Sequence, residues 1–307
     1  MRKENFRNIA IIAHVDHGKT TLVDGLLKQS GTFQDHQEIE DRVMDSMDLE
    51  KERGITITAK NTAINYNDIK INIMDTPGHA DFGGEVERSL NLVDGALLLV
   101  DSSEGPLPQT RFVLKKALEK DLPIILVINK IDRADARIEE VIDEVYDLFI
   151  DLDANENQIE FPIIYTNAKN GIAHTSLDKE SKNLEPLFET ILSEIKGPLA
   201  DDNKEAQFLI TSLDYDSYVG QIAIGRLTSG KLKMSENYAL CAEDKIEHNH
   251  KFSALYTFEG LKRVQVDEVE AGDIIAVAGI DGLTIGDTIS DNEVPSALSR
   301  IMVDEPT

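Results

Sequence analysis

The sequence predicts an α/β domain with a mostly parallel, doubly wound sheet, followed by an all-β barrel domain. Over the first 200 residues, short apolar runs alternate with stretches of helical periodicity, which is the pattern of a parallel sheet connected by helices. Beyond that point the helical periodicity ends, and strand-like runs are separated by turn residues. A polar stretch containing Gly-Pro lies between the two patterns.

Five apolar runs predict the strands of the first domain. Short, nearly continuous apolar runs indicate strands that are covered on both faces, as in a parallel sheet. They are Ile9–Ala13, Ile69–Met74, Ala96–Val100, Ile124–Ile128 and Pro162–Tyr165. The predicted helices between them are Thr20–Gln29, Gly84–Val93, Gln109–Glu119, Ile138–Ile150 and Leu184–Ile195. In the fourth of these, apolar residues recur at helical spacing from Ile138 to Phe149.

Residues 197–205 predict the boundary between the domains, because they are mostly polar and begin with Gly-Pro. We expect a first domain over residues 1–198, a linker over 199–202, a barrel over 203–299 and, at 300–307, the start of a truncated third domain. The predicted barrel strands include Phe208–Leu213, Val219–Leu227 and Asp273–Ala278.

The composition predicts a globular protein of the cytoplasm. Hydrophobic residues make up 41% and charged residues 29% of the 307 residues, as in folded water-soluble proteins. No apolar run approaches the roughly 20 residues of a membrane-spanning helix, and Met1–Phe6 lacks the apolar core of a signal peptide. Cys241 is the only cysteine, which excludes an intramolecular disulfide and favours a reducing compartment. We therefore predict no membrane partner.

The charge balance is strongly acidic. Lysine and arginine number 31 and aspartate and glutamate 57, so the formal net charge is −26. Such a charge repels phosphate backbones and argues against DNA as a partner and against sequence-independent nucleic-acid binding. Solubility explains most of these charges. A partner that contains nucleic acid would have to be bound through local patches or through another part of the protein.

A phosphate-binding loop is predicted between the first strand and the first helix. The run Ala13–Thr20, Ala-His-Val-Asp-His-Gly-Lys-Thr, follows a strand and opens a helix, which is the context that this motif requires. Gly18 permits close backbone approach, and N–H groups at the helix start hold the phosphate charge. Lys19 can reach the β- and γ-phosphates, and the Thr20 hydroxyl is placed to ligate Mg²⁺. Ala13 departs from the general motif, which has glycine there, and the alternative is a chance Gly-Lys-Thr at a helix start.

Neither of two histidine pairs predicts a metal site. His14 and His17 belong to the phosphate loop and have only one further acidic group near them. His248 and His250 lie in the polar stretch Glu243–Lys251, which predicts a solvated loop rather than a set of ligands.

A second motif, Asp-Thr-Pro-Gly at residues 75–78, ends the predicted strand Ile69–Met74. The Asp75 carboxylate at a strand end can hold Mg²⁺, commonly through a water molecule. The Gly78 N–H can bond a γ-phosphate and move when that phosphate leaves. Asp-x-x-Gly alone is also an ordinary turn sequence, so the strand context carries the prediction.

Two further segments predict recognition of guanine. In Asn129-Lys130-Ile131-Asp132, the Asp132 carboxylate can accept two hydrogen bonds from the ring N–H and the exocyclic amine of guanine, a donor pair that adenine lacks. Lys130 and Asn129 would pack on the base and brace the loop. A surface helix cap is the alternative interpretation.

The second of these segments is Thr166-Asn167-Ala168-Lys169. The backbone N–H of Ala168 would bond the guanine carbonyl oxygen. Asn167 stands where GTPases usually have serine, which affects the side-chain bond and leaves the backbone contact unchanged.

A switch segment is predicted before the second motif. Residues 35–52 are polar and rich in charge, and they lead into Arg-Gly-Ile-Thr-Ile at 53–57. Such a segment has little apolar surface to hold it by packing. Thr56 is placed to complete the Mg²⁺ shell when GTP is bound, so the segment would order with the γ-phosphate and be released on hydrolysis. An ordinary surface loop is the alternative.

Together these motifs resemble those of the translational GTPases, and four further stretches resemble the BipA/TypA family in particular. They are Asp48–Arg53, Gly105–Phe112, Leu213–Gly220 and Val303–Thr307. The resemblance covers nearly the whole chain, weakens in Glu243–Phe258, and includes alanine as the first residue of the phosphate loop. It implies a GTP-binding domain, a β-barrel and further domains outside this chain. It also implies GTP-dependent ribosome binding, linked to ribosome assembly and to stress or cold adaptation.

The resemblance further implies a mechanism. His79 would position the attacking water, Val15 and Ile55 would gate that histidine, and Asp16 would lie near the phosphates. Positioning and charge neutralisation would carry catalysis. Because no residue of the chain stands out as an arginine finger, intrinsic hydrolysis of GTP to GDP would be slow and the ribosome would accelerate it. A structural histidine is the alternative role for His79.

The predicted site thus has three parts. The nucleotide-binding residues are Asp16, His17, Gly18, Lys19, Thr20, Thr21, Gly78, Asn129, Lys130, Asp132, Ala168 and Lys169. The Mg²⁺ ligands are Thr20, Thr56 and Asp75. The catalytic residue is His79, with the gate residues Val15 and Ile55.

Three other functions stay open. The chain could be an elongation-type factor that moves tRNA, or a guanine-nucleotide sensor with little hydrolysis, which His79 and Thr56 disfavour. An ATP-dependent enzyme conflicts with Asp132. Single-turnover hydrolysis by the wild type and by a His79→Ala variant would separate a GTPase from a sensor.

Overall fold

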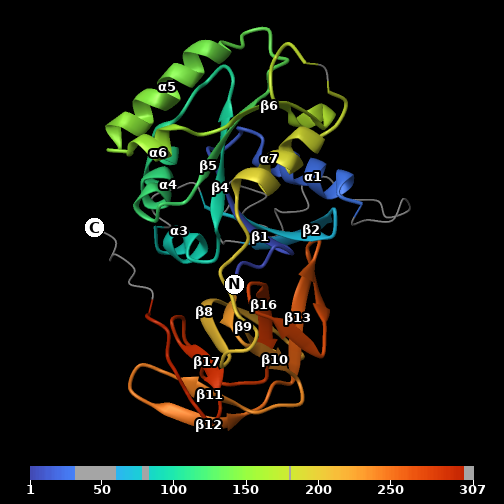
Figure 1. Cartoon of the computed structure of the whole chain (residues 1–307), viewed down its shortest axis with the longest axis vertical. Coiled ribbons are helices and arrows are strands. Elements are labelled where there is room, and N and C mark those ends of the chain that lie inside the picture. The colour runs from blue at the N-terminus through green and yellow to red at the C-terminus, as the bar shows by residue number, and fades with distance from the viewer. Residues whose placement is uncertain (32–59, 78–82, 180, 301–307) are drawn as a thin grey trace.

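The computed structural model describes residues 1–31, 60–77, 83–179 and 181–300, which form two large sheets and a short two-stranded one (Figure 1). The first sheet has seven strands in the order β2-β3-β1-β4-β5-β6-β7. Strands β3, β1, β4, β5 and β6 run parallel to one another, and β2 and β7 are antiparallel strands at the two edges. The strand bounds are β1 Phe6–Ala13, β2 Lys60–Tyr66, β3 Ile69–Asp75, β4 Gly95–Asp101, β5 Ile124–Asn129, β6 Ile163–Asn167 and β7 Ile172–His174.

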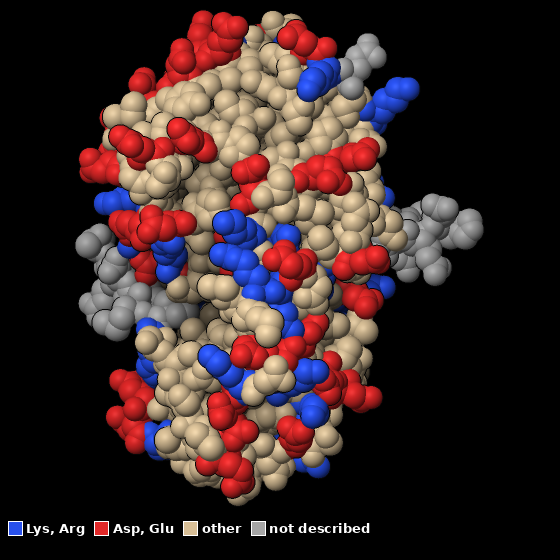
Figure 2. Space-filling model, viewed as in Figure 1, with Lys and Arg blue, Asp and Glu red and all other residues tan. Residues whose placement is uncertain are grey.

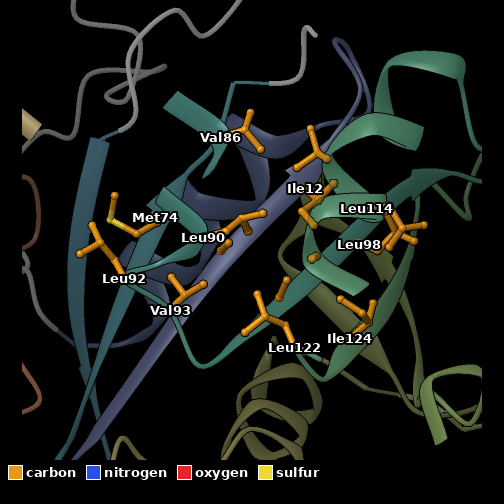
Figure 3. Close-up of a cluster of buried hydrophobic side chains, with 14 of the residues drawn as sticks. Ile12, Met74, Val86, Leu90, Leu92, Val93, Leu98, Leu114, Leu122 and Ile124 are labelled. Atoms are coloured by element: carbon orange, nitrogen blue, oxygen red, sulfur yellow. The ribbon is translucent and has the colours of Figure 1, made fainter. Parts of the chain in front are cut away.

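Helices cover both faces of this sheet, which confirms the predicted α/β fold (Figure 1). On one face, Val86 of α3 and Leu114 of α4 share a core (Figure 3), which also contains Val145 of α5. On the other, Leu26 of α1 and Phe188 of α7 share a second core. The helices are α1 Lys19–Gln29, α3 Gly83–Leu90, α4 Pro108–Glu119, α5 Ile138–Asp151, α6 Glu156–Ile159, the 3₁₀ turn η2 Ala168–Asn170 and α7 Glu185–Glu194.

Alternate side chains of β1 contact the two cores on opposite faces of the sheet. Ala10 and Ile12 face the first core, and Ile9 and Ile11 face the second. A central strand must be apolar on both sides when helices cover both faces, so the uninterrupted apolar run of the sequence is what places β1 in the middle. In Figure 3, Ile12 lies among side chains of neighbouring strands and helices.

The second sheet is entirely antiparallel, and it forms the all-β domain that was predicted for the C-terminal part. Its eight strands follow the order β12-β11-β17-β8-β9-β16-β13-β14, and β10 and β15 form a separate pair. Leu240 of β11 and Leu255 of β13 lie near opposite ends of that order but share one core, so the sheet curls around its own interior as a barrel does. The bounds are β8 Gln207–Asp216, β9 Gly220–Ser229, β10 Lys231–Lys233, β11 Tyr238–Cys241, β12 Ile246–His250, β13 Ala254–Glu259, β14 Lys262–Gln265, β15 Glu268–Glu270, β16 Ile274–Ala278 and β17 Thr288–Asp291.

One expectation about the second sheet is wrong. Residues 243–251 were expected to form a solvated loop, but Ile246–His250 is the edge strand β12, paired with β11. An edge strand exposes side chains on both faces and needs no apolar alternation. His248 and His250 therefore sit on an exposed strand. Among the described residues, no group of three or more His, Cys, Asp or Glu side chains is arranged to hold a metal ion.

The two sheets are joined by buried polar contacts. Lys70 of β3 donates to the Asp273 carboxylate beside β16 at 2.7 and 2.9 Å. Asn72 Nδ2 donates to Asp273 Oδ1 at 3.0 Å and to Asn8 Oδ1 at 2.9 Å. The turn after β13 reaches the edge strand β2, where Ala63 and Gly260 exchange backbone hydrogen bonds of 2.9 and 2.7 Å.

Replacing Lys70 with methionine is expected to destabilise this junction by about 2–4 kcal/mol, because it leaves the buried Asp273 carboxylate without its cation. The side chains of Lys70 and Asp273 are only 15% and 7% exposed. Urea unfolding of the wild type and the variant measures the difference. Lys231→Met is the matched control, since Lys231 pairs with Glu268 on the surface and its loss should leave the midpoint nearly unchanged. Equal midpoints for all three proteins would contradict the prediction.

The N-terminal segment bonds to the residues that follow the first domain. Lys3 N donates to Pro198 O, and Ala200 N donates to Met1 O, both at 2.9 Å. Lys3 Nζ pairs with Asp202 and, at 2.9 Å, with Glu270. The predicted linker thus runs along the start of the chain. Of the predicted start of a third domain, all but Arg300 lies outside the described residues.

No helix in the described part of the chain is both long and apolar enough to span a lipid bilayer.

Candidate nucleotide-binding site

The predicted phosphate loop lies between β1 and α1, at the carboxyl edge of the parallel sheet. Two of its residues adopt positive φ angles, Asp16 at 66° and Gly18 at 96°. The first turn of α1 contains no acidic residue, and the N-cap position, Gly18, offers no side-chain cap. The helix start therefore directs its N–H groups and the positive end of its dipole into the loop, which suits an anion.

Lys19 and Asp75 meet beside this loop. Lys19 Nζ forms an ion pair with the Asp75 carboxylate and donates to Thr76 O at 3.1 Å. Asp75 ends β3 next to β1, where Ile11 is its register partner. The residue is only 2% exposed, so its charge needs a cation close by. The predicted phosphate-binding lysine and the predicted metal ligand are thus brought together.

Asn129, at the end of β5, ties three predicted segments to one another. Its Nδ2 donates to His17 O of the phosphate loop at 2.8 Å. Its Oδ1 accepts from Thr166 Oγ1 at 3.0 Å and from Ala168 N at 3.1 Å. The Ala168 N–H was expected to face the base, so binding guanine in the predicted way would require it to be shared or to change partner.

Lys130 follows in a strained conformation, with φ at 60°. Its Nζ donates to Asp16 O of the phosphate loop at 2.6 Å and lies 2.7 Å from Asp101 Oδ2. Asp132 and Lys169 are exposed at the same edge of the sheet. Their side chains are therefore accessible to a ligand.

His17 is turned inward rather than toward the loop. Its side chain is fully buried, with Nδ1 3.4 Å from Leu99 O and Nε2 3.5 Å from Glu104 Oε2. Burial lowers the pKa of its imidazole, and the nearby His14 ring lowers it further, against the hydrogen bond at Leu99 and the acidic groups around it. The neutral ring fills space under the loop, so a nucleotide could meet only the backbone of His17.

Of the remaining predicted residues, Val15 and Thr20 are partly buried and Thr21 is exposed. Four others lie outside the described residues. These are Ile55 and Thr56 of the predicted switch segment, and Gly78 and His79 of the second motif.

Asp101, at the end of β4, belongs to the site and was missed by sequence reasoning. The side chain is completely buried and lies 2.7 Å from Lys130 Nζ and 3.4 Å from Arg133 Nη1. A signal existed, because an aspartate directly after the apolar run Ala96–Val100 must lie at the carboxyl edge of a central strand.

Replacing Gly18 with alanine is expected to weaken nucleotide binding at least tenfold. A Cβ at Gly18 would lie 2.4 Å from Asn129 Nδ2, and the residue has a φ of +96° that L side chains rarely adopt. Three hydrogen bonds hold the Asn129 amide, so the loop would have to move instead. Titration with fluorescent GDP measures the loss. Gly31→Ala is the control, because Gly31 also has a positive φ but no heavy atom within 4 Å of an added Cβ. Equal affinities for both variants would refute the steric argument.

The described residues also fit a divalent cation that is bound together with phosphates. Mg²⁺ is usually held by one or two carboxylates or hydroxyls, with phosphate oxygens and water completing its shell. Asp75 is a buried carboxylate that already holds a cationic group, the Lys19 ammonium. Thr20 is the second residue of α1, directly after Lys19. A cation therefore suits this position, and the nucleotide would supply its remaining ligands.

Comparison with known proteins agrees with this geometry. Residues 4–197 match the family described as the elongation factor Tu GTP binding domain, and residues 220–290 match elongation factor Tu domain 2. A crystal structure of a Thermus thermophilus protein superposes with a TM-score of 0.72 at 18% identity, covering 99% of this chain and 57% of that one. The fold and the site thus define a translation-factor type of GTP-binding domain followed by an antiparallel β domain.

Individual relatives show to which family of this class the chain belongs. The chain is 52% identical over 305 residues to the "Large ribosomal subunit assembly factor BipA" of Bacillus subtilis and 53% identical over 304 residues to that of Salmonella typhimurium. These alignments cover 99% of this chain and 50% of each relative, so the chain spans about half the length of the curated relatives it matches. It belongs to the BipA/TypA family of translational GTPases.

Proposed function

We propose that this chain is the GTP-hydrolysing switch portion of a ribosome-associated assembly factor. The observation that carries the proposal is the Asn129 side chain, which bonds the phosphate loop on one side and the Thr166–Ala168 segment on the other. This arrangement supports the assignment of phosphate binding to the start of α1 and of base binding to the adjacent edge, because nucleotides bind at the carboxyl end of the parallel sheet in such folds.

Guanine recognition is assigned to the exposed Asp132. Its carboxylate would accept hydrogen bonds from the ring N–H and the exocyclic amine. Lys130 and Asn129 would support the base from the adjacent loop, and Ala168 and Lys169 would close the other side. Adenine lacks this pair of donors. If it covered the carboxylate, the carboxylate would be left without hydrogen bonds, at a cost of about 1–3 kcal/mol or more, which disfavours ATP.

The triphosphate is assigned to the loop between β1 and α1. Backbone N–H groups from Asp16 to Thr21 would surround the phosphates, with Gly18 allowing their close approach. Lys19 would leave Asp75 and turn to the β- and γ-phosphates. Mg²⁺, held by Thr20, Asp75 and Thr56, would neutralise charge on the phosphate oxygens.

Hydrolysis to GDP and phosphate is assigned to water positioned by His79, with Val15 and Ile55 controlling the position of that side chain. Gly78 would bond the γ-phosphate and release on hydrolysis. The chemistry needs orientation and charge neutralisation more than a covalent group. Intrinsic turnover should therefore be slow until a partner fixes the histidine.

The ribosome is the partner that we propose, in assembly of its large subunit, with the cytoplasm as the compartment. The support is that the relatives from Bacillus subtilis and Salmonella typhimurium are named large ribosomal subunit assembly factors. The net charge of −26 argues against general RNA binding by this half of the protein. Figure 2 shows acidic groups over both halves of the visible face and basic groups gathered near its waist, so contact with RNA would be local.

Calorimetry with GTP, GDP and ATP, each with Mg²⁺ or with EDTA, tests the nucleotide assignment. We expect guanine nucleotides to bind at least a hundredfold more tightly than ATP, and GTP binding to weaken without Mg²⁺. Equal affinity for ATP and GTP would refute the proposal.

Single-turnover hydrolysis tests the catalytic assignment. The rate for His79→Ala should fall at least tenfold while its GDP affinity stays unchanged. An unchanged rate would favour a guanine-nucleotide sensor. A larger rate enhancement by ribosomes for the full-length wild type than for the variant would support the ribosomal role.

A further inference from the structure

The Asp101 carboxylate, at the end of β4, contacts two separate segments of the chain. Its Oδ1 accepts from Ser103 N and Ser103 Oγ, both at 2.8 Å, and from Glu104 N at 3.4 Å. Its Oδ2 faces Lys130 Nζ at 2.7 Å and Arg133 Nη1 at 3.4 Å. One oxygen therefore fixes the turn after β4, while the other faces the cations that follow β5.

Lys130 connects Asp101 to the candidate nucleotide-binding site. Lys130 Nζ also donates to Asp16 O of the phosphate loop at 2.6 Å. The ammonium thus lies between a loop carbonyl and the Asp101 carboxylate, and its position is set from both sides. A flexible lysine side chain loses rotamer entropy when it is fixed, so contacts within the protein that fix it lower the entropic cost of binding a ligand.

The backbone around Lys130 is held by the same segment of β4. Ser102 N donates to Asn129 O at 2.9 Å, and Ser102 Oγ donates to Lys130 O at 2.8 Å. Lys130 has a φ of 60°, a conformation that non-glycine residues adopt rarely. Such a conformation persists where surrounding contacts over-determine it, and the Asp101–Ser102 segment supplies these contacts.

Asp101 keeps its charge under all physiological conditions. Burial alone would raise the pKa of this carboxyl, but the hydrogen bonds from Lys130 and Ser103 outweigh burial and lower the pKa to about 2. Its other cationic neighbour, Arg133, is more exposed and bonds the Asp135 carboxylate at 2.8 Å with both Nε and Nη2. Lys130 is therefore the closer partner of Asp101, and Arg133 divides its contacts between Asp101 and Asp135.

We propose that Asp101 is a positioning residue for guanine-nucleotide binding, which acts by fixing the Lys130 ammonium against the phosphate loop. The proposal rests on the proposed function, because it assigns Lys130 to the nucleotide. It adds a residue from β4 to a site otherwise built from the ends of β1, β3, β5 and β6. The consequence is that contacts within the protein hold the segment after β5 against the phosphate loop.

The replacement Asp101→Asn separates the contact of this side chain with Ser103 from its contact with Lys130. The amide oxygen can still accept from Ser103, whereas the amide nitrogen cannot accept from Lys130. We expect the Kd for GDP to rise about 10- to 30-fold, because a charge-assisted contact that orders the binding lysine is lost. Stopped-flow kinetics with fluorescent GDP should show most of the change in the dissociation rate.

A double-mutant cycle with Lys130→Met shows whether Asp101 acts through Lys130. If it does, the double variant binds GDP no more than about threefold more weakly than the weaker single variant. Fully additive losses would overturn the proposal, since they would mean that Asp101 supports the fold independently of Lys130. Thermal unfolding of each nucleotide-free variant separates loss of affinity from loss of stability.

Two controls test the other contacts of Asp101. Ser103→Ala removes one bond to Oδ1, and Arg133→Gln removes the second cation; both should keep the Kd for GDP within about twofold. A loss for Ser103→Ala equal to that for Lys130→Met would assign Asp101 to its own turn and overturn the proposal, even if Asp101→Asn does not fold. A wild type that fails to bind GDP would instead refute the proposed function.

Discussion

Replacing Asp132 with asparagine is expected to lower the affinity for GTP by about 10²- to 10⁴-fold and to create affinity for xanthosine triphosphate. Two hydrogen bonds from guanine to a carboxylate contribute about 1.5–3 kcal/mol each, and every 1.4 kcal/mol is tenfold in affinity. Xanthine carries a carbonyl where guanine carries its amine. The asparagine amide can donate to that carbonyl and still accept from the ring N–H.

Competition of fluorescent GDP with GTP, XTP and ATP measures this change of specificity. Asp135→Asn is the matched control, because Asp135 is an exposed aspartate three residues further on that bonds Arg133. It should keep the wild-type order of affinities. If Asp132→Asn bound GTP as the wild type does, the carboxylate would not face the base, and the assignment of guanine to this edge of the sheet would be wrong.

Much of the first domain could be predicted because its strands are apolar on both faces. The run Ile9–Ala13 becomes most of β1, and Ile124–Ile128 becomes β5 but for its last residue. The edge strand β2, Lys60–Tyr66, was missed, since polar residues interrupt its apolar ones. The polar edge strand β12 was assigned to a loop for a related reason. A strand that is buried on both faces can be recognised in the sequence by its continuous apolar run. An edge strand can be polar, and it forms because it pairs with the neighbouring strand.

In the candidate site, the residues of local motifs could be predicted, but the contacts between the motifs could not. Gly18, Lys19 and Asn129 were predicted because their motifs are short and local. The contacts between motifs could not be predicted, since they depend on the strand order that sets β4 between β1 and β5. That order brings Asp101 to Lys130, although the two residues are 29 positions apart in the sequence (130 − 101).

Replacing Lys19 with methionine is expected to weaken GTP binding by about 10³-fold. Its ammonium is the cationic group of the predicted phosphate loop, and loss of one partner from a buried charge contact costs about 3–5 kcal/mol. Lys28→Met is the matched control, because Lys28 lies in the last turn of the same helix and is exposed. Calorimetry should show wild-type affinity for that control and almost no heat for Lys19→Met at micromolar protein.

The Lys19–Asp75 contact makes this loss depend on Mg²⁺ in a specific way. Lys19 pairs with the Asp75 carboxylate, which is 2% exposed, so if Lys19 turns to the phosphates we expect Mg²⁺ to supply positive charge beside that carboxylate. Binding of GTP to the wild type should therefore weaken strongly in EDTA. In Asp75→Asn the carboxylate needs no replacement cation, and the ratio of affinities with and without Mg²⁺ should fall toward one. If that ratio stayed at the wild-type value, Asp75 would not be the group that Mg²⁺ neutralises, and the exchange of Lys19 for the metal ion would be excluded.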